Sequence, residues 1–101
     1  MKFETFFPNQ NRHVRFLLGL YISRKRRESG ASLTELANKA DLTPQSIKRI
    51  EAGRMNVTPR IFGNLQVALG FEAEDLNEIR RIAGVAYIND LSKVLVPNFP
   101  V

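Results

Sequence analysis

The stretch from Asp41 to Gly53, DLTPQSIKRIEAG, carries start and stop signals for one short helix. Thr43 is a favourable N-cap, because its hydroxyl can accept a hydrogen bond from a backbone N–H of the first turn. Pro44 suits the first helical position, where its missing N–H removes no hydrogen bond. A glycine such as Gly53 commonly follows the end of a helix. Together these signals predict a helix over residues 44–52.

The two faces of this predicted helix differ in chemistry. Ile47 and Ile50 mark an apolar face that suits a protein core. The opposite face carries, at helical spacing, Gln45, Lys48, Arg49 and Ala52. Glutamine can pair with adenine and arginine with guanine in the major groove of DNA. A solvated charged face is the alternative interpretation, because many surface helices carry such a stripe.

The preceding segment predicts a second helix close by. Ser32 and Glu35 have the spacing of a capping box, which predicts a helix from Leu33 to about Ala40. Asp41 is expected to adopt the left-handed conformation, which aspartate tolerates better than most residues. Leu42 is expected to be a buried plug beneath the turn. Two short helices joined by so short a turn have helix-turn-helix geometry.

Similar signals divide the rest of the chain. Asn11 is expected to cap a helix from about Arg12 to Ser29, with Gly30 as its stop. Thr58 and Pro59 repeat the cap-plus-proline start, and this helix is expected to end at Leu69 before Gly70. A fifth helix is predicted from Glu74 and Asp75 to about Ala83, with Gly84 breaking the pattern. These boundaries divide the chain into an N-terminal arm, residues 1–11, a domain, residues 12–83, and a C-terminal extension, residues 84–101.

The C-terminal extension is apolar for a chain end. Helical spacing relates Val85, Ile88, Leu91 and Leu95. These side chains need a surface to bury against, and a second copy of the chain is the expected one, because homodimers dominate soluble oligomers. Folding back onto the extension's own domain is the alternative.

The distribution of charge points to a polyanionic partner. Residues 1–60 hold twelve of the fifteen lysines and arginines and only five of the ten acidic residues, whereas residues 61–101 are mildly acidic. A basic half suggests nucleic acid. A membrane surface is less favoured, because the basic residues do not lie along one amphipathic helix. No apolar run approaches the roughly 20 residues of a membrane span, and the N-terminus lacks a secretory pattern, so we expect a cytoplasmic protein.

Composition argues against catalysis. The 101 residues include no cysteine and one histidine, so thiolate metal sites and disulfides are excluded. No glycine-rich phosphate loop and no acidic cluster with metal-ligand spacing occurs. We therefore predict a protein that is not an enzyme, with no cofactor, no metal site and no evident small-molecule ligand.

The sequence from Ser32 to Gly53 resembles the XRE family of helix-turn-helix regulators, which includes the lambdoid phage repressors and Cro proteins. The resemblance covers about residues 14–83, and its most specific pieces are Glu-Leu-Ala at 35–37 and Ile-Lys-Arg-Ile-Glu-Ala-Gly at 47–53. It implies an all-α, five-helix, lambda-repressor-like domain that binds two-fold-symmetric double-stranded DNA as a homodimer.

The resemblance also implies roles for individual residues. The helix over 44–52 becomes the recognition helix, with base-reading positions at Pro44, Gln45, Lys48 and Arg49. The positions near the phosphate backbone are Ser32, Thr43, Ser46, Arg54, Asn56 and Arg60. In resembling repressors the residues at the positions of Arg26 and Glu51 form a partly buried ion pair.

Three departures from the family pattern limit what can be carried over. Leu33 stands where members often have a glutamine that touches a phosphate, and Asp41 replaces the usual turn glycine. Pro44 can offer a base only apolar contact. The DNA sequence of the operator therefore cannot be inferred from the operators of relatives.

The sequence thus predicts a sequence-specific DNA-binding transcriptional regulator, a repressor acting as a homodimer. The alternative is an antitoxin that binds a toxin-like protein partner and regulates its own operator.

Overall fold

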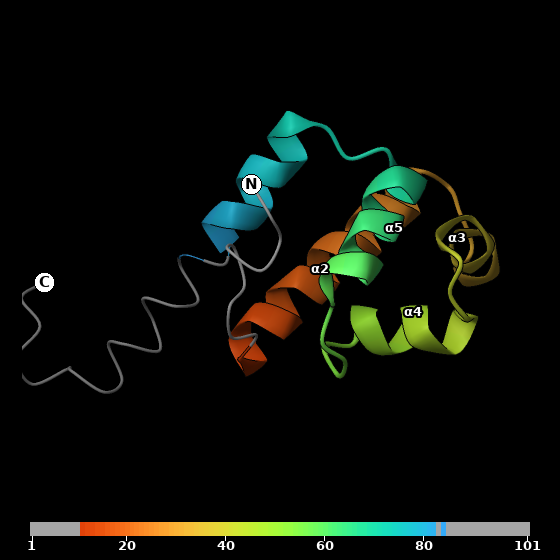
Figure 1. Ribbon diagram of the computed structural model, residues 1–101, viewed down its shortest axis with the longest axis horizontal. Coiled ribbons are helices and arrows are strands. Elements are labelled where there is room, and N and C mark those ends of the chain that lie inside the picture. The colour runs from red at the N-terminus through yellow and green to blue at the C-terminus, as the bar shows by residue number, and fades with distance from the viewer. Residues whose placement is uncertain (1–10, 83, 85–101) are drawn as a thin grey trace, which may run out of the picture.

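The computed structural model describes residues 11–82 and Gly84, and the helices keep the labels of Figure 1. They are α2 (Arg12–Glu28), α3 (Leu33–Ala40), α4 (Pro44–Glu51) and α5 (Pro59–Leu69). A further helical segment spans residues 73–82. Because this part of the chain contains no strand, the predicted all-α, five-helix class is confirmed. Residues 1–10 and 85–101, including Val85, Ile88, Leu91 and Leu95, lie outside the described residues.

The labelled helices begin where their capping residues predict. The N-caps are Asn11, Ser32, Thr43 and Thr58, and each side chain accepts a hydrogen bond from a backbone N–H of the first turn. At α3 the capping box is complete. Ser32 Oγ accepts from the N–H of Glu35 at 3.0 Å, and the Glu35 carboxylate accepts from the N–H of Ser32 at 2.8 Å. These bonds satisfy donors that have no partner within the helix.

Several helix bounds differ from prediction. Helix α2 ends at Glu28 rather than Ser29, which is its C-cap, and the last helix begins at residue 73 rather than Glu74. Helix α4 ends at Glu51 rather than Ala52, because Ala52 is already the C-cap and Gly53 follows at a φ of 72°. Gly84, expected to break the last helix, is itself helical. A glycine costs a helix interior about 1 kcal/mol relative to alanine and does not forbid the conformation.

The turn between α3 and α4 consists of residues 41–43. Asp41 has a φ of 54°, the left-handed conformation predicted for it. The N–H of Leu42 then donates to the carbonyl of Ala37 at 2.9 Å, which closes the turn. The Leu42 side chain packs against the core but is only partly buried, so it is less enclosed than predicted.

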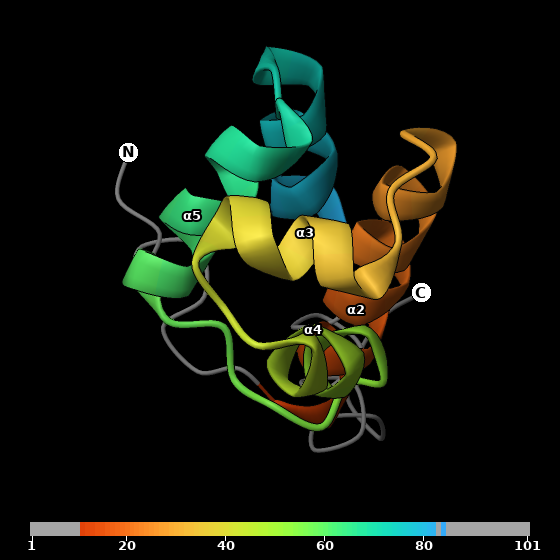
Figure 2. The same ribbon diagram turned by 90° about the vertical axis from the view of Figure 1, so that its right-hand side faces the viewer.

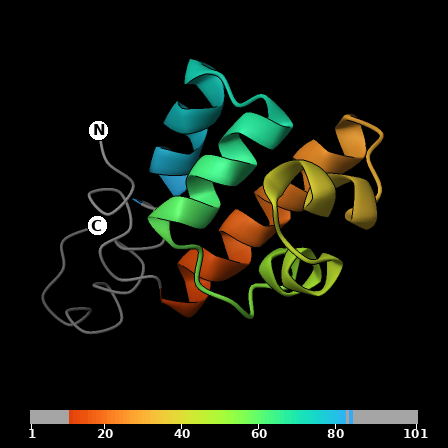
Figure 3. The same ribbon diagram turned by 45° about the vertical axis from the view of Figure 1, so that its right-hand side comes forward.

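Packing places α4 across two other helices. It contacts α2 and α3, and α3 in turn contacts α5 (Figures 2 and 3). The largest fully buried side chains come from all of these elements and from the segments that follow them: Leu18, Ile22, Leu36, Ile47, Ile50, Val57, Leu65 and Ile79. One continuous core therefore supports the helix-turn-helix unit from behind.

Close approach of backbones fixes α4 against α2. A Cβ added at Gly19 would meet the carbonyl oxygen of Ile50 and lie 2.8 Å from that of Glu51. At Gly53, which also has a positive φ, a Cβ would lie 2.9 Å from the Phe16 Cα. Both distances are shorter than van der Waals contact allows. At the C-terminal end of α4, the main chain therefore packs directly against the main chain of α2.

A polar network attaches the 73–82 segment to α2. The Tyr21 hydroxyl donates to Asp75 Oδ1 at 2.5 Å, and Lys25 Nζ lies 3.0 Å from the same oxygen. Phe71 is buried and meets the Tyr21 ring edge-on with centroids 6.0 Å apart. Burial, followed by the hydrogen bond to Asp75, raises the pKa of Tyr21 to about 12. The network holds the last described helix in place.

Candidate nucleic-acid interface

The outward face of α4 is polar, exposed and hollowed. Ile47 and Ile50 are fully buried, which turns the opposite side of the helix to solvent. The exposed residues on that side are Pro44, Gln45, Lys48, Arg49 and Ala52. A hollow of about 520 Å³, here called the α4 hollow, is lined by Gln45, Lys48, Arg49, Ala52 and Arg54. Four of the predicted interface residues are thus brought together around one concave surface.

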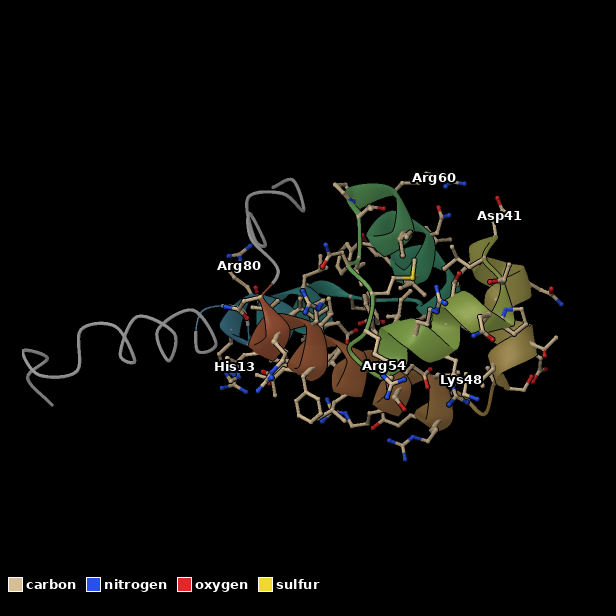
Figure 4. The ribbon with its side chains drawn as sticks, turned by 90° about the horizontal axis from the view of Figure 1, so that it is seen from below. His13, Asp41, Lys48, Arg54, Arg60 and Arg80 are labelled. Carbon is tan, nitrogen blue, oxygen red and sulfur yellow. The ribbon has the colours of Figure 1, made fainter. Side chains whose placement is uncertain are left out.

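The other predicted phosphate-contacting residues are more scattered. Arg54, Asn56 and Arg60 are exposed, but Figure 4 shows Arg60 on the opposite edge of the molecule from Arg54 and Lys48. Thr43 is also exposed, and its hydroxyl donates to Ser46 Oγ and accepts from the Ser46 N–H, both at 3.0 Å. Its single proton is therefore engaged within the cap.

Ser32, at the start of α3, is exposed and has a different pattern of hydrogen bonds. Its hydroxyl accepts from the Glu35 N–H, and the Glu35 carboxylate accepts from the Ser32 N–H. Hydrogen bonds from the Ser32 backbone and side chain lower the pKa of Glu35. The capping box therefore leaves a carboxylate beside this predicted phosphate contact, which makes the Ser32 position less favourable for an anion.

Arg15 positions the loop after α4, a role that the sequence did not indicate. Its Nε donates to the carbonyl of Gly53, and its Nη1 donates to Asn56 Oδ1, each at 3.4 Å. Arg15 lies on α2, nearly forty residues away in sequence, so no local pattern relates it to this loop. The contact fixes the loop that carries Arg54 beside the end of α4.

The ion pair expected between Arg26 and Glu51 is present. Arg26 Nε donates to Glu51 Oε2 at 2.6 Å, and Nη2 donates to Oε1 at 3.0 Å, so the pair is bidentate. A third donor, Nη1, reaches the carbonyl of Ala31 at 3.0 Å. The hydrogen bond to Glu51 raises the pKa of Arg26. The pair neutralises a carboxylate that would otherwise stand close to the positive face of α4.

The fold and this face define a helix-turn-helix protein, because two short helices are joined by a three-residue turn and the second presents Gln, Lys and Arg outward. The chain belongs to the helix-turn-helix domain family, whose model matches residues 17–79. The resemblance noted from the sequence is thereby confirmed at the level of this family.

Solved structures with the same fold include two crystal structures of the clp gene regulator ClgR from Corynebacterium glutamicum. One is 30% identical with a TM-score of 0.62, over 87% of this chain and 96% of that chain. The other is 25% identical with a TM-score of 0.61, over 72% of this chain and 91% of that chain. No curated protein matches the sequence significantly.

The part of the chain that the structure describes has no helix with both the length and the apolar character that a membrane span requires. It also contains no group of three or more histidine, aspartate or glutamate side chains that could hold a metal ion.

Proposed function

We propose that the chain is a cytoplasmic, sequence-specific DNA-binding transcriptional regulator that inserts α4 into the major groove. The observation that carries this proposal is the α4 hollow, in which Gln45, Lys48 and Arg49 stand together on an exposed helix face. Membership of the helix-turn-helix family supports it, as does the similarity to ClgR, which is described as a gene regulator.

The proposed interface combines contacts to bases with contacts to phosphates. Gln45 and Arg49 read base edges, Lys48 lies beside them, and Pro44 offers apolar contact to a thymine methyl group. Phosphate contacts set affinity and register without reading sequence, and we assign them first to Arg54, Asn56 and Ser46. The resemblance also implies Ser32, Thr43 and Arg60. These three are weaker assignments, because the Glu35 carboxylate lies beside Ser32, the Thr43 hydroxyl donates to Ser46, and Arg60 lies on the opposite edge of the molecule (Figure 4). Arg54 is the strongest of these assignments, because it lines the α4 hollow itself.

Arg49→Ala tests the assignment of base reading. A lost bidentate contact to guanine costs about 1–3 kcal/mol of specific binding and relaxes preference at one base pair of each half-site. Selection of bound sequences from a random duplex pool first supplies the operator, and fluorescence anisotropy then compares the operator with a scrambled duplex. Arg54→Ala is the matched variant, and it should weaken binding to the operator and to the scrambled duplex by the same factor. Equal losses on both duplexes for Arg49→Ala would make Arg49 a phosphate contact.

We further propose that the regulator is a homodimer that represses transcription, with Val85, Ile88, Leu91 and Leu95 of the 84–101 extension forming the contact between subunits. Two recognition helices must lie about 34 Å apart to enter successive major grooves on one side of the duplex. Light scattering should report a dimer at tens of micromolar, and a chain with Ile88→Asp and Leu91→Asp should be monomeric. A monomeric wild-type chain would contradict this proposal.

The antitoxin alternative is favoured by a separate observation. Phe16 and Leu20, one turn apart on α2, are 53% and 46% exposed, which gives this helix an apolar outer face. A protein partner could bury them. Co-expression with the neighbouring gene product and stable co-purification of the two would support this function, whereas DNA binding and repression by the chain alone would favour the first.

A further inference from the structure

A second hollow adjoins the first. Its volume is about 420 Å³, and we call it the α2 hollow, lined by Arg12, His13, Phe16, Ala52, Gly53 and Arg54. Ala52 and Arg54 line both hollows, so the two form one surface that runs from α4 across the following loop to the start of α2. Figure 4 shows His13, Arg54 and Lys48 along the same edge of the molecule.

The chemistry of the α2 hollow suits an anion. Two arginines and a histidine line it, and no aspartate or glutamate among the described residues does. Its remaining large side chain is that of Phe16, a residue that is 53% exposed, and it forms an apolar wall. DNA carries one negative charge per roughly 1.7 Å of duplex, and its sugars provide apolar edges between the phosphates. Both features of the hollow match a sugar–phosphate backbone.

The geometry of the hollow is set by main-chain contacts. Gly53 lies so close to α2 that an added Cβ would be 2.9 Å from the Phe16 Cα, and Arg15 hydrogen-bonds to the carbonyl of Gly53. The arginines on the two sides, Arg12 on α2 and Arg54 on the loop, therefore extend from backbones held at a fixed separation. A prearranged site loses less conformational entropy when it binds.

We propose that the α2 hollow binds the sugar–phosphate backbone of the duplex next to the bases that α4 reads, with Arg12 neutralising one further phosphate per subunit. The inference rests on the proposed function, because the duplex is the same one. It extends the interface beyond the helix-turn-helix unit to Arg12, which lies twenty residues before that unit begins.

The salt dependence of binding tests this assignment and needs no operator, because non-specific affinity is electrostatic. The probe is a fluorescein-labelled duplex of mixed sequence, titrated between about 50 and 200 mM KCl. Arg12→Gln should lower the slope of log K against log salt by about 0.9 per bound subunit, and Arg12→Lys should restore it. Arg24→Gln is the matched control, because Arg24 lies on the same helix but lines a different hollow with Glu78.

Each outcome decides one claim. A slope that falls for Arg12→Gln and stays unchanged for Arg24→Gln supports the inference, provided that circular dichroism shows both variants folded. An unchanged slope for Arg12→Gln, or an equal fall for both variants, overturns it while leaving the proposed function intact. Wild-type protein that fails to bind the duplex even at the lowest salt overturns the proposed function itself, and the inference falls with it.

Discussion

Replacing Glu51 with alanine should destabilise the domain more than any exposed charge substitution. The Glu51 carboxylate accepts two hydrogen bonds from Arg26, and the two side chains are only 12% and 15% exposed. In the variant, Arg26 retains its bond to the carbonyl of Ala31 but loses its counter-charge. Stranding one partner of a buried ion pair costs about 3–5 kcal/mol. Because the pair still reaches solvent, we expect the lower end, about 3 kcal/mol.

Thermal unfolding followed by far-UV circular dichroism measures this cost. For a domain of this size, 1 kcal/mol corresponds to about 4–8 °C in Tm, so Glu51→Ala should lower Tm by about 12–24 °C. Glu28→Ala is the control, because Glu28 is 58% exposed and lies 3.8 Å from Arg24 in an i,i+4 pair. Exposed helix pairs contribute only about 0.3–0.5 kcal/mol, so its Tm should change by a few degrees at most.

A double variant separates the contribution of the ion pair to stability from that of side-chain packing. Arg26→Met with Glu51→Leu replaces both charges with apolar side chains, which for buried pairs is often neutral or stabilising. It should recover most of the Tm lost in Glu51→Ala. The reasoning is refuted if Glu51→Ala melts within a few degrees of Glu28→Ala. It is equally refuted if the double variant remains as unstable as the single one.

Two further outcomes follow from the contacts of α2. Gly19→Ala should lower the free energy of unfolding by about 1–3 kcal/mol, because its Cβ would lie 2.8 Å from a carbonyl oxygen of α4. Gly63→Ala is the control, because a Cβ at Gly63 would have no atom within 4 Å, and it should leave Tm unchanged or raise it. Tyr87 is the other tyrosine of the chain, so a Tyr87→Phe variant leaves Tyr21 as the only phenol. Its ultraviolet absorbance should show a pKa of about 12 for Tyr21, whereas a pKa near 10 would contradict its burial. Because the folded pKa is the higher one, this contribution to stability is complete below about pH 10 and disappears as the pH rises towards 12.

Features encoded by neighbouring residues were predictable. The start of every labelled helix is signalled by a capping side chain and, for α4 and α5, by a proline at the first position. The left-handed conformation of Asp41 was also predictable, because aspartate tolerates it better than most residues. The outward face of α4 followed from helical periodicity alone once Ile47 and Ile50 were assigned to the core.

Features that depend on distant contacts were not predictable from local pattern. Arg15 read as one basic residue among many, and only the fold brings it to Gly53. Asp75 was expected only to begin the fifth helix. It also accepts a hydrogen bond from Tyr21, more than fifty residues away in sequence, and pairs with Lys25. The ion pair of Arg26 was anticipated through family resemblance rather than through residue spacing. Local signals specify helices, whereas side-chain partners across the fold require the packing itself.

The contact at Gly19 has a consequence for redesign. Because the end of α4 rests on the main chain of α2, its position depends little on the side chains it turns to solvent. Exchanging Gln45, Lys48 and Arg49 for another set should therefore alter what the helix displays without altering where it lies. The position of α4 and the side chains that it exposes can therefore be changed separately, and Gly19, which has no Cβ, is the residue of α2 that must be kept.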